Sequence, residues 1–166
     1  YSTFCVVSHA MLAAPGSGGG HCGAMEIRRS ALVLHPARDM FRLVQDVPAY
    51  PQFLSWCVRS EVHEQTAEMQ LATLTVKVSG MTQTFTTRNR FVTGERLTLS
   101  LVEGPFRSLA GEWRFEPLGE DGSKVTLLLD FNFSSRVLSS AFRRGFTHIA
   151  DRLVSDFCKR ADDVYG

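Results

Sequence analysis

The side chains of this chain that could perform acid–base chemistry are five histidines and a scattered set of carboxylates. His148 precedes Asp151 by three residues, and on a helix this spacing could bring the two side chains together as a local polar pair. A solvated or otherwise satisfied histidine is the more common outcome on a helix than a general base. Asp130 and Asn132 alternate onto one face of a strand-like stretch and are interpreted as a solvated pair. We therefore predict no catalytic residue.

The cysteines could supply nucleophiles or metal ligands, but their spacing argues against both roles. The chain has no CxxC pair and no histidine at ligand spacing among its four cysteines, which are Cys5, Cys22, Cys57 and Cys158. We expect reduced thiols, with Cys57 and Cys158 acting as small core residues. The sequence also contains no P-loop, GxGxxG, GxSxG or HExxH motif. These absences predict a protein that is not an enzyme and has no metal site.

The most unusual stretch is the apolar segment 50–57, YPQFLSWC, which follows a short helical pattern. Pro48 and Pro51 prevent it from forming a long regular helix, because proline lacks an amide donor and disfavours helical geometry before it. It is also too apolar for an ordinary solvated loop. The segment is therefore either a lid over a cavity or a plug in the core.

Patterns on both sides of this segment predict the elements that position it. Residues 26–34 have the pattern of a strand, and Pro36 suits the first position of a helix that runs to about Val44. Beyond Trp56, alternation of apolar and polar residues predicts about six antiparallel strands. The clearest alternation lies in residues 74–78, 85–91, 97–101, 113–115 and 125–133.

The last third of the chain has the period of a long amphipathic helix. Apolar residues recur every three or four positions from Leu138 to Val164, and Ser134 or Ser135 could cap the start. The predicted outer face carries Arg136, Arg143, Arg144, Arg152, Lys159 and Arg160. A curved antiparallel sheet wrapped around this helix would bury both apolar faces at once. The predicted fold class is α+β, with six to seven strands around a long C-terminal helix and two short helices after the first strand.

Length and composition fit one globular domain that needs no disulfide or metal for stability. The net charge of +1 gives no support to nucleic-acid binding by bulk charge, and no apolar run approaches the roughly 20 residues of a membrane span. Residues 1–24 hold no Lys, Arg, Asp or Glu and include a glycine-rich stretch. We expect them to be a disordered leader, a cloning remnant or upstream translation, with the domain covering residues 25–166.

Several motifs in the same order resemble the coenzyme Q-binding START-domain family of the SRPBCC superfamily, which includes the bacterial RatA (ribosome association toxin) branch. The similar segments are residues 29–33, 40–44, 50–57, 84–89, 101–106, 111–115 and 129–133. The family usually has proline where this chain has Ser55, so the segment is less rigid here. The resemblance implies the START-like helix-grip fold over about residues 25–166.

Relatives in this family are described as binding polyprenyl quinones or other lipids between sheet and helix, in support of respiratory electron transport. No cofactor would be required, but ubiquinone or another polyprenyl lipid could be bound. The expected ligand-binding residues are Tyr50, Phe53, Leu54, Trp56, Phe106, Trp113, Phe131, Phe133, Phe142, Phe146 and Ile149. Phe106 is interpreted as a latch at the cavity mouth. The same aromatic residues could instead fill the core, and the sequence pattern leaves this choice open.

The RatA branch implies an alternative, namely a toxin that binds the large ribosomal subunit and inhibits translation initiation. Membrane headgroups or ribosomal RNA would then contact the cations Arg143, Arg144, Arg152, Lys159 and Arg160. A cyclase or hydrolase is a third hypothesis, supported only by analogy of fold. We expect a cytoplasmic protein with peripheral contact to the inner membrane in a bacterium, or a mitochondrial one in a eukaryote.

Overall fold

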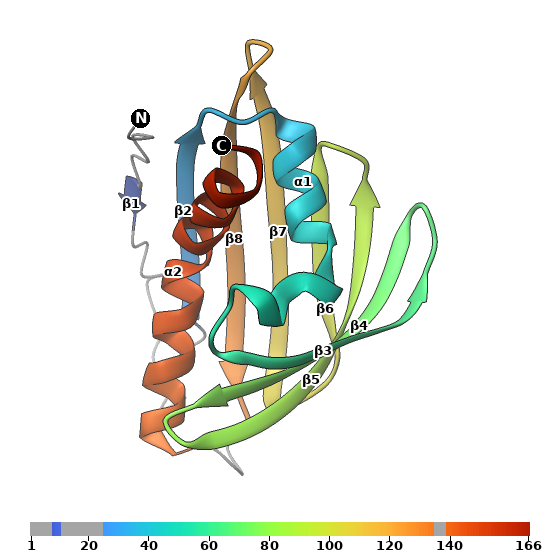
Figure 1. Cartoon of the computed structure of the whole chain (residues 1–166). Coiled ribbons are helices and arrows are strands. Elements are labelled where there is room, and N and C mark those ends of the chain that lie inside the picture. Colours follow the sequence, from blue (N-terminus) through green and yellow to red (C-terminus); the bar gives the residue numbers. More distant parts are fainter. Residues whose placement is uncertain (1–7, 11–24, 135–138) are drawn as a thin grey trace, which may run out of the picture.

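The computed structural model describes residues 8–10, 25–134 and 139–166 (Figure 1). In chain order its elements are β1 (Ser8–Ala10), β2 (Met25–Val33), α1 (Ala37–Gln45), the 3-10 helix η1 (Val47–Gln52), β3 (Cys57–Gln65), β4 (Met69–Val78), β5 (Met81–Val92), β6 (Arg96–Glu103), β7 (Phe106–Leu118), β8 (Gly122–Phe133) and α2 (Ser140–Tyr165). The two short helices and the long C-terminal helix confirm the predicted element order.

The strands form one antiparallel sheet in the order β1-β2-β8-β7-β6-β5-β4-β3. In Figure 1 the sheet curves strongly, and α2 lies along the part that β2 and β8 form. The two short helices follow β2 and lie on the same side of the sheet as α2. The predicted α+β helix-grip architecture is confirmed, with seven long strands and the short strand β1 at one edge.

The alternation in sequence determines which side chains face the helix. In β5, Phe85, Thr87, Asn89 and Phe91 are buried, whereas Arg88 and Arg90, which lie between them in the sequence, are exposed. Since side chains in a strand alternate between its two faces, this buried series places two polar residues, Thr87 and Asn89, on the inner face of the sheet.

One close approach fixes the start of α2 against the sheet. Gly145 faces the turn after β4, and a Cβ atom at this position would lie 2.2 Å from Cγ1 of Val78. Ser79 adds a hydrogen bond from its hydroxyl to the carbonyl of Ala141, 3.4 Å long. Only glycine lets the first turns of α2 lie this close to the β4–β5 turn.

Three details differ from the sequence-based expectations. Pro36 is the N-cap residue of α1 and not its first helical residue. Helix α2 begins at Ser140, and the hydroxyl of Ser139 accepts a hydrogen bond from the amide of Phe142, so Ser139 is the cap in place of Ser134 or Ser135. Within residues 1–24, Ser8–Ala10 pair with β2 as a short strand that the sequence pattern did not predict. Ser135, Arg136 and Leu138 lie outside the described residues.

Two polar contacts hold α2 on β2 and the loop that follows it. Arg29 of β2 is buried and forms an ion pair with Asp151 of α2. Near the other end of the helix, Nε2 of His35 lies 2.7 Å from Oδ1 of Asp162. Because buried charges are stable only when paired, these contacts fix the position of the helix over the sheet as well as contributing to stability. None of the described helices is long and apolar enough to span a bilayer.

Candidate functional site

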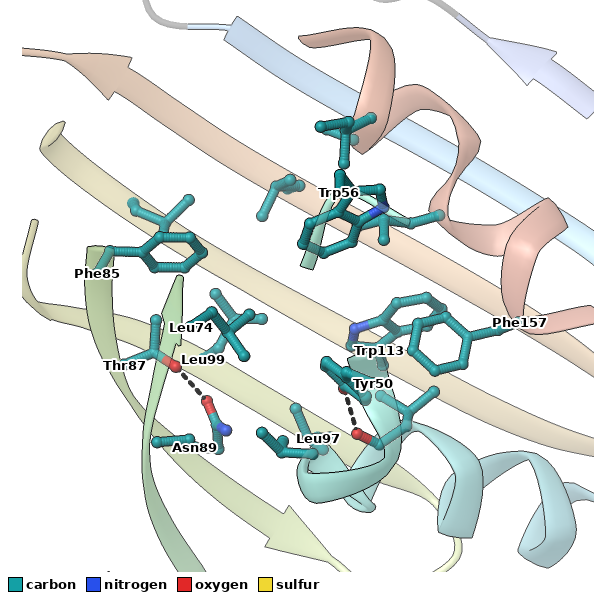
Figure 2. A pocket seen from close by; sticks show the side chains of 18 of the residues that line it. Tyr50, Trp56, Leu74, Phe85, Thr87, Asn89, Leu97, Leu99, Trp113 and Phe157 are labelled. Atoms are coloured by element: carbon teal, nitrogen blue, oxygen red, sulfur yellow. Dashed lines mark hydrogen bonds between the residues drawn. The ribbon is translucent and has the colours of Figure 1, made fainter. Parts of the chain in front are cut away.

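A small apolar cavity lies between the sheet and the middle of α2, with a volume of about 100 Å³. The α2 side of its wall is formed by Phe146, Ile149, Ala150, Leu153 and Phe157, which recur at helical spacing. The opposite wall comes from β4 to β8, and η1 with the residues after it closes one side. Figure 2 shows the side chains that line this space. The helix and the curved sheet thus leave between them a partly open cavity that their packed side chains do not fill.

Five of the predicted ligand-binding residues lie in this wall. They are Tyr50, Trp56, Trp113, Phe146 and Ile149. In Figure 2, Trp113 and Phe157 lie together on one side of the cavity, and their ring centroids are 5.3 Å apart in an edge-on arrangement. The YPQFLSWC segment therefore closes part of the cavity through Tyr50 and Trp56.

Four other predicted residues do not line the cavity. Phe106, Phe131, Phe133 and Phe142 pack with Phe85 and Phe146 in a cluster of six phenylalanine rings near the start of α2. The prediction that Phe106 is a latch at the mouth is wrong, because only 6% of this residue is exposed. The turn before it directs the ring inward, where aromatic contacts stabilise it. This end of the space between sheet and helix is filled.

Leu54 and Phe53 also lie away from the cavity. Leu54 is fully buried in the core. Phe53 packs against Tyr50 and Phe157 and lines a separate, more polar surface groove of about 470 Å³. The guanidinium of Arg160 lies 4.9 Å from the centre of its ring. Phe53 therefore joins η1 to the C-terminal part of α2 from the outside.

Two polar residues of the cavity wall, Thr87 and Asn89 of β5, were not predicted from the sequence. The hydroxyl of Thr87 donates to Oδ1 of Asn89 at 2.9 Å, the contact drawn in Figure 2. Nδ2 of Asn89 donates to Oε1 of Gln70 at 2.9 Å, and Nε2 of Gln70 donates to the backbone carbonyl of Gln45 at 3.1 Å. The signal was present in the sequence, since both residues share the strand face of Phe85 and Phe91.

Two groups at the side that η1 closes are held in their neutral forms. The hydroxyl of Tyr50 donates to the carbonyl of Val44. Burial is the main cause that raises the pKa of Tyr50, and the electrostatic effects of the nearby Cys57 and Asp46 raise it further. Burial also raises the pKa of the Cys57 thiol to about 11, although the hydrogen bond to Arg59 acts in the opposite direction. Cys57 and Cys158 are both buried, as predicted, and Cys5 and Cys22 lie outside the described residues.

The volume of the cavity limits what it can hold in this conformation. Pockets for small-molecule ligands are usually about 300–1,000 Å³, and an engineered cavity of about 150 Å³ holds benzene. A cavity of about 100 Å³ is at this smaller scale, so it accepts no more than one small ring and not a polyprenyl tail. Binding of a longer ligand requires η1 or α2 to move.

The predicted cationic residues of α2 divide into two groups. Arg143 lies over the Phe133 ring, and Arg160 contacts Phe53 and Gln52, so both are engaged with their own chain. Arg144, Arg152 and Lys159 are exposed along one side of the helix, and we name these three residues the basic stripe. Asp156 lies beside the stripe; burial raises the pKa of its carboxyl, while Arg152, Lys159 and His148 act to lower it.

The candidate acid–base pair is absent. Asp151 pairs with Arg29 and not with His148, which is exposed, because the carboxylate turns toward the sheet. Among the described residues, no three His, Cys, Asp or Glu side chains gather as a metal site.

Comparison with known proteins gives the family. A profile described as "Polyketide cyclase / dehydrase and lipid transport" matches residues 33–158. The ribosome association toxin RatA of Pseudomonas aeruginosa is 43% identical over 140 residues, which are 84% of this chain and 97% of that protein. The mitochondrial coenzyme Q-binding protein coq10 of Schizosaccharomyces pombe is 25% identical over 81% of this chain and 85% of that protein.

A solved structure shares the fold at low identity. The Zhui aromatase/cyclase from Streptomyces sp. R1128 superimposes with a TM-score of 0.75 at 18% identity, over 84% of this chain and 94% of that one. At this identity the likeness concerns the fold alone. The profile matches most of the chain, and the RatA protein of Pseudomonas aeruginosa is similar along nearly its whole length, so this chain belongs to the polyketide cyclase/dehydrase and lipid transport family.

Proposed function

We propose that this protein associates with the ribosome, through its large subunit, and that the basic stripe of α2 makes the contact. The observation that carries the proposal is the exposed position of Arg144, Arg152 and Lys159 on one side of a single rigid helix. From Arg144 to Lys159 the stripe extends about 22 Å at 1.5 Å per residue. Cations on such a surface bind RNA phosphates and release counterions, even when the net charge of the protein is close to zero.

The comparisons support the same function. A relative with 43% identity along nearly its full length is named a ribosome association toxin, whereas the relative named for coenzyme Q is 25% identical. An inhibitor of subunit joining needs a binding surface and no catalytic group. This fits the exposed His148 and the carboxylate of Asp151, which is already paired with Arg29. A protein with this function would act in the cytoplasm and would not be an enzyme.

Co-sedimentation with isolated large subunits tests the proposal. We expect the wild-type protein to sediment with the subunits at low salt, and the double variant Arg144→Glu/Arg152→Glu to remain in the supernatant. A matched control is Arg88→Glu/Arg90→Glu, which makes the same charge change on two exposed residues of the outer face of β5. Loss of binding in the control with retention in the stripe variant would move the interface to the sheet and overturn the assignment to α2.

A second candidate function is binding of an apolar ligand, such as the ring of a quinone, in the cavity. The specific observation in its favour is the apolar wall of Tyr50, Trp113 and Phe146 over a space that side chains leave empty. Each methylene buried there would contribute about 0.8 kcal/mol. The ring would enter the resting cavity, and a polyprenyl tail would extend only if η1 and α2 separate.

Native mass spectrometry of protein purified from its own source without detergent tests this second function. We expect a discrete adduct that organic extraction identifies as an isoprenoid or another apolar molecule. A clean mass without adduct, repeated after incubation with quinone-loaded vesicles, would exclude a stable quinone complex. That result would leave ribosome association unaffected.

A further inference from the structure

We infer that the cavity selects ligands that carry a hydrogen-bond donor, a hydroxyl above all, and that Thr87 is the residue that accepts it. This inference rests on the second candidate function, ligand binding in the cavity. Thr87 and Asn89 are the two residues of its wall whose side chains are neither aliphatic nor aromatic. Trp56 also lines the cavity, and its buried indole N–H finds no hydrogen-bond partner among the described residues, so the wall offers a donor as well. These groups decide which polar group a ligand can bring into an otherwise apolar space, and a hydroxyl can both donate to Thr87 and accept from Trp56.

A backbone carbonyl, that of Gln45, determines which atoms donate and which accept in the hydrogen bonds that lead to Thr87. The carbonyl of Gln45 can only accept, so the side-chain amide of Gln70 must present its nitrogen there, at 3.1 Å. The oxygen of Gln70 then faces Asn89, which must present its own nitrogen, at 2.9 Å. The network thus assigns the nitrogen and oxygen positions of both side-chain amides, because it begins at a backbone carbonyl that can only accept.

The consequence for Thr87 follows at the end of this chain. With its nitrogen committed to Gln70, Asn89 presents Oδ1 to Thr87, whose hydroxyl proton must point to that oxygen. The proton of Thr87 is therefore not available to a ligand, but a lone pair on Oγ1 is. The wall offers an acceptor at this point, and the matching ligand group is a donor.

At Thr87 itself a carbonyl is disfavoured for the same reason. To bind it, Thr87 would have to withdraw its proton from Asn89 and leave an amide oxygen unsatisfied in apolar surroundings, which is unfavourable. A hydroxyl avoids this penalty. A ring that carries a hydroxyl can therefore use both Thr87 and Trp56, whereas a ring that carries only a carbonyl is limited to a donor such as the indole of Trp56.

Two small probes of nearly equal size test the inference. Phenol carries a hydroxyl donor and fluorobenzene does not, and either ring is close to the scale of the cavity. We expect NMR titration of the full chain to give tighter binding of phenol than of fluorobenzene, by roughly 2- to 10-fold, the range of one net hydrogen bond. The shifted resonances should belong to cavity residues such as Ala72 and Leu99.

The variant Thr87→Val, which keeps the shape and removes the oxygen, should reduce the affinity for phenol to that for fluorobenzene. Thr84→Val, on the exposed face of the same strand, is the matched control and should change neither affinity. Equal affinities of the wild-type protein for both probes would overturn the inference while leaving ligand binding in place. Failure of both probes to bind would remove the cavity function itself, and the comparison in wild type holds even if Thr87→Val does not fold.

Discussion

Arg29 and Asp151 are 122 residues apart in the chain and form an ion pair that joins β2 to the middle of α2. Asp151 directly follows Ala150, which is part of the cavity wall. The pair therefore fixes the section of the helix that closes the cavity. The side chain of Arg29 is 7% exposed and that of Asp151 is 35% exposed. The buried guanidinium therefore depends on the carboxylate for its stabilisation more than the partly exposed carboxylate depends on the guanidinium.

Asp151→Asn should destabilise the protein by about 2 kcal/mol. Removing one partner of a buried pair costs about 3–5 kcal/mol, and the partial exposure of Asp151 lowers this value. Chemical denaturation measures the change in the free energy of unfolding. The control is Asp163→Asn, an exposed carboxylate on the same helix, which should stay within about 0.5 kcal/mol of wild type. Equal effects of the two variants would show that the ion pair does not hold the helix.

Ala72→Val tests whether the cavity is empty. Ala72 lies in the cavity wall, opposite Thr87 on the neighbouring strand, and added methyl groups would occupy free space. We expect a gain of up to about 1 kcal/mol, since a cavity costs about 24 cal/mol per Å³. The same change at Ala31, buried outside the cavity, should cost about 1–3 kcal/mol by overpacking. Two equal losses in thermal unfolding would mean that the space at Ala72 is already filled.

Phe106→Ala should cost about 3–5 kcal/mol, because the ring packs against four other phenylalanine rings in a filled cluster. This replaces the interpretation from sequence that Phe106 is a latch at the cavity mouth. Phe53→Ala, at a half-buried ring, should cost less. Denaturant titration of both variants compares them, and a smaller loss at Phe106 than at Phe53 would contradict the packed cluster.

The raised pKa of Cys57 predicts how stability changes at high pH. An unfolded thiol titrates near 9.0, whereas the folded one titrates near 11, so the folded state holds its proton longer. The stability linked to this proton is complete below pH 9 and is lost as the pH rises toward 11. Cys57→Ala should therefore lose less stability than wild type between pH 9 and 11. Parallel pH curves for the two proteins would show that Cys57 does not contribute.

The fold could be predicted because its patterns are local. Alternation in residues 125–133 and the helical period before Val164 each specify one element and one buried face. Several features of the site could not be predicted from these patterns. Phe106 and Phe146 are the same residue type and are equally buried. Only the tertiary contacts show that Phe106 lies in a filled cluster, whereas Phe146 belongs to that cluster and also borders the cavity.

Polar residues were harder to interpret than apolar ones. Asp151 follows His148 at a spacing that suggested a pair, and a sheet residue more than a hundred positions away takes the carboxylate instead. Arg143 and Arg160 matched the basic face by period, yet aromatic rings within reach engage both. The helical repeat of the sequence predicts on which side of a helix a residue lies. The partners of a long side chain depend instead on the residues that the fold brings near it.

The salt dependence of binding to isolated large ribosomal subunits tests the central claim most directly. The affinity of the wild-type protein should fall steeply with salt, and neutralising two stripe residues in Arg152→Gln/Lys159→Gln should reduce the slope of log K against log salt by about 2. Asp156→Asn, which removes the carboxylate beside the stripe, should raise the affinity. An unchanged slope in the double variant, with binding intact, would contradict the assignment of the basic stripe as the ribosome contact.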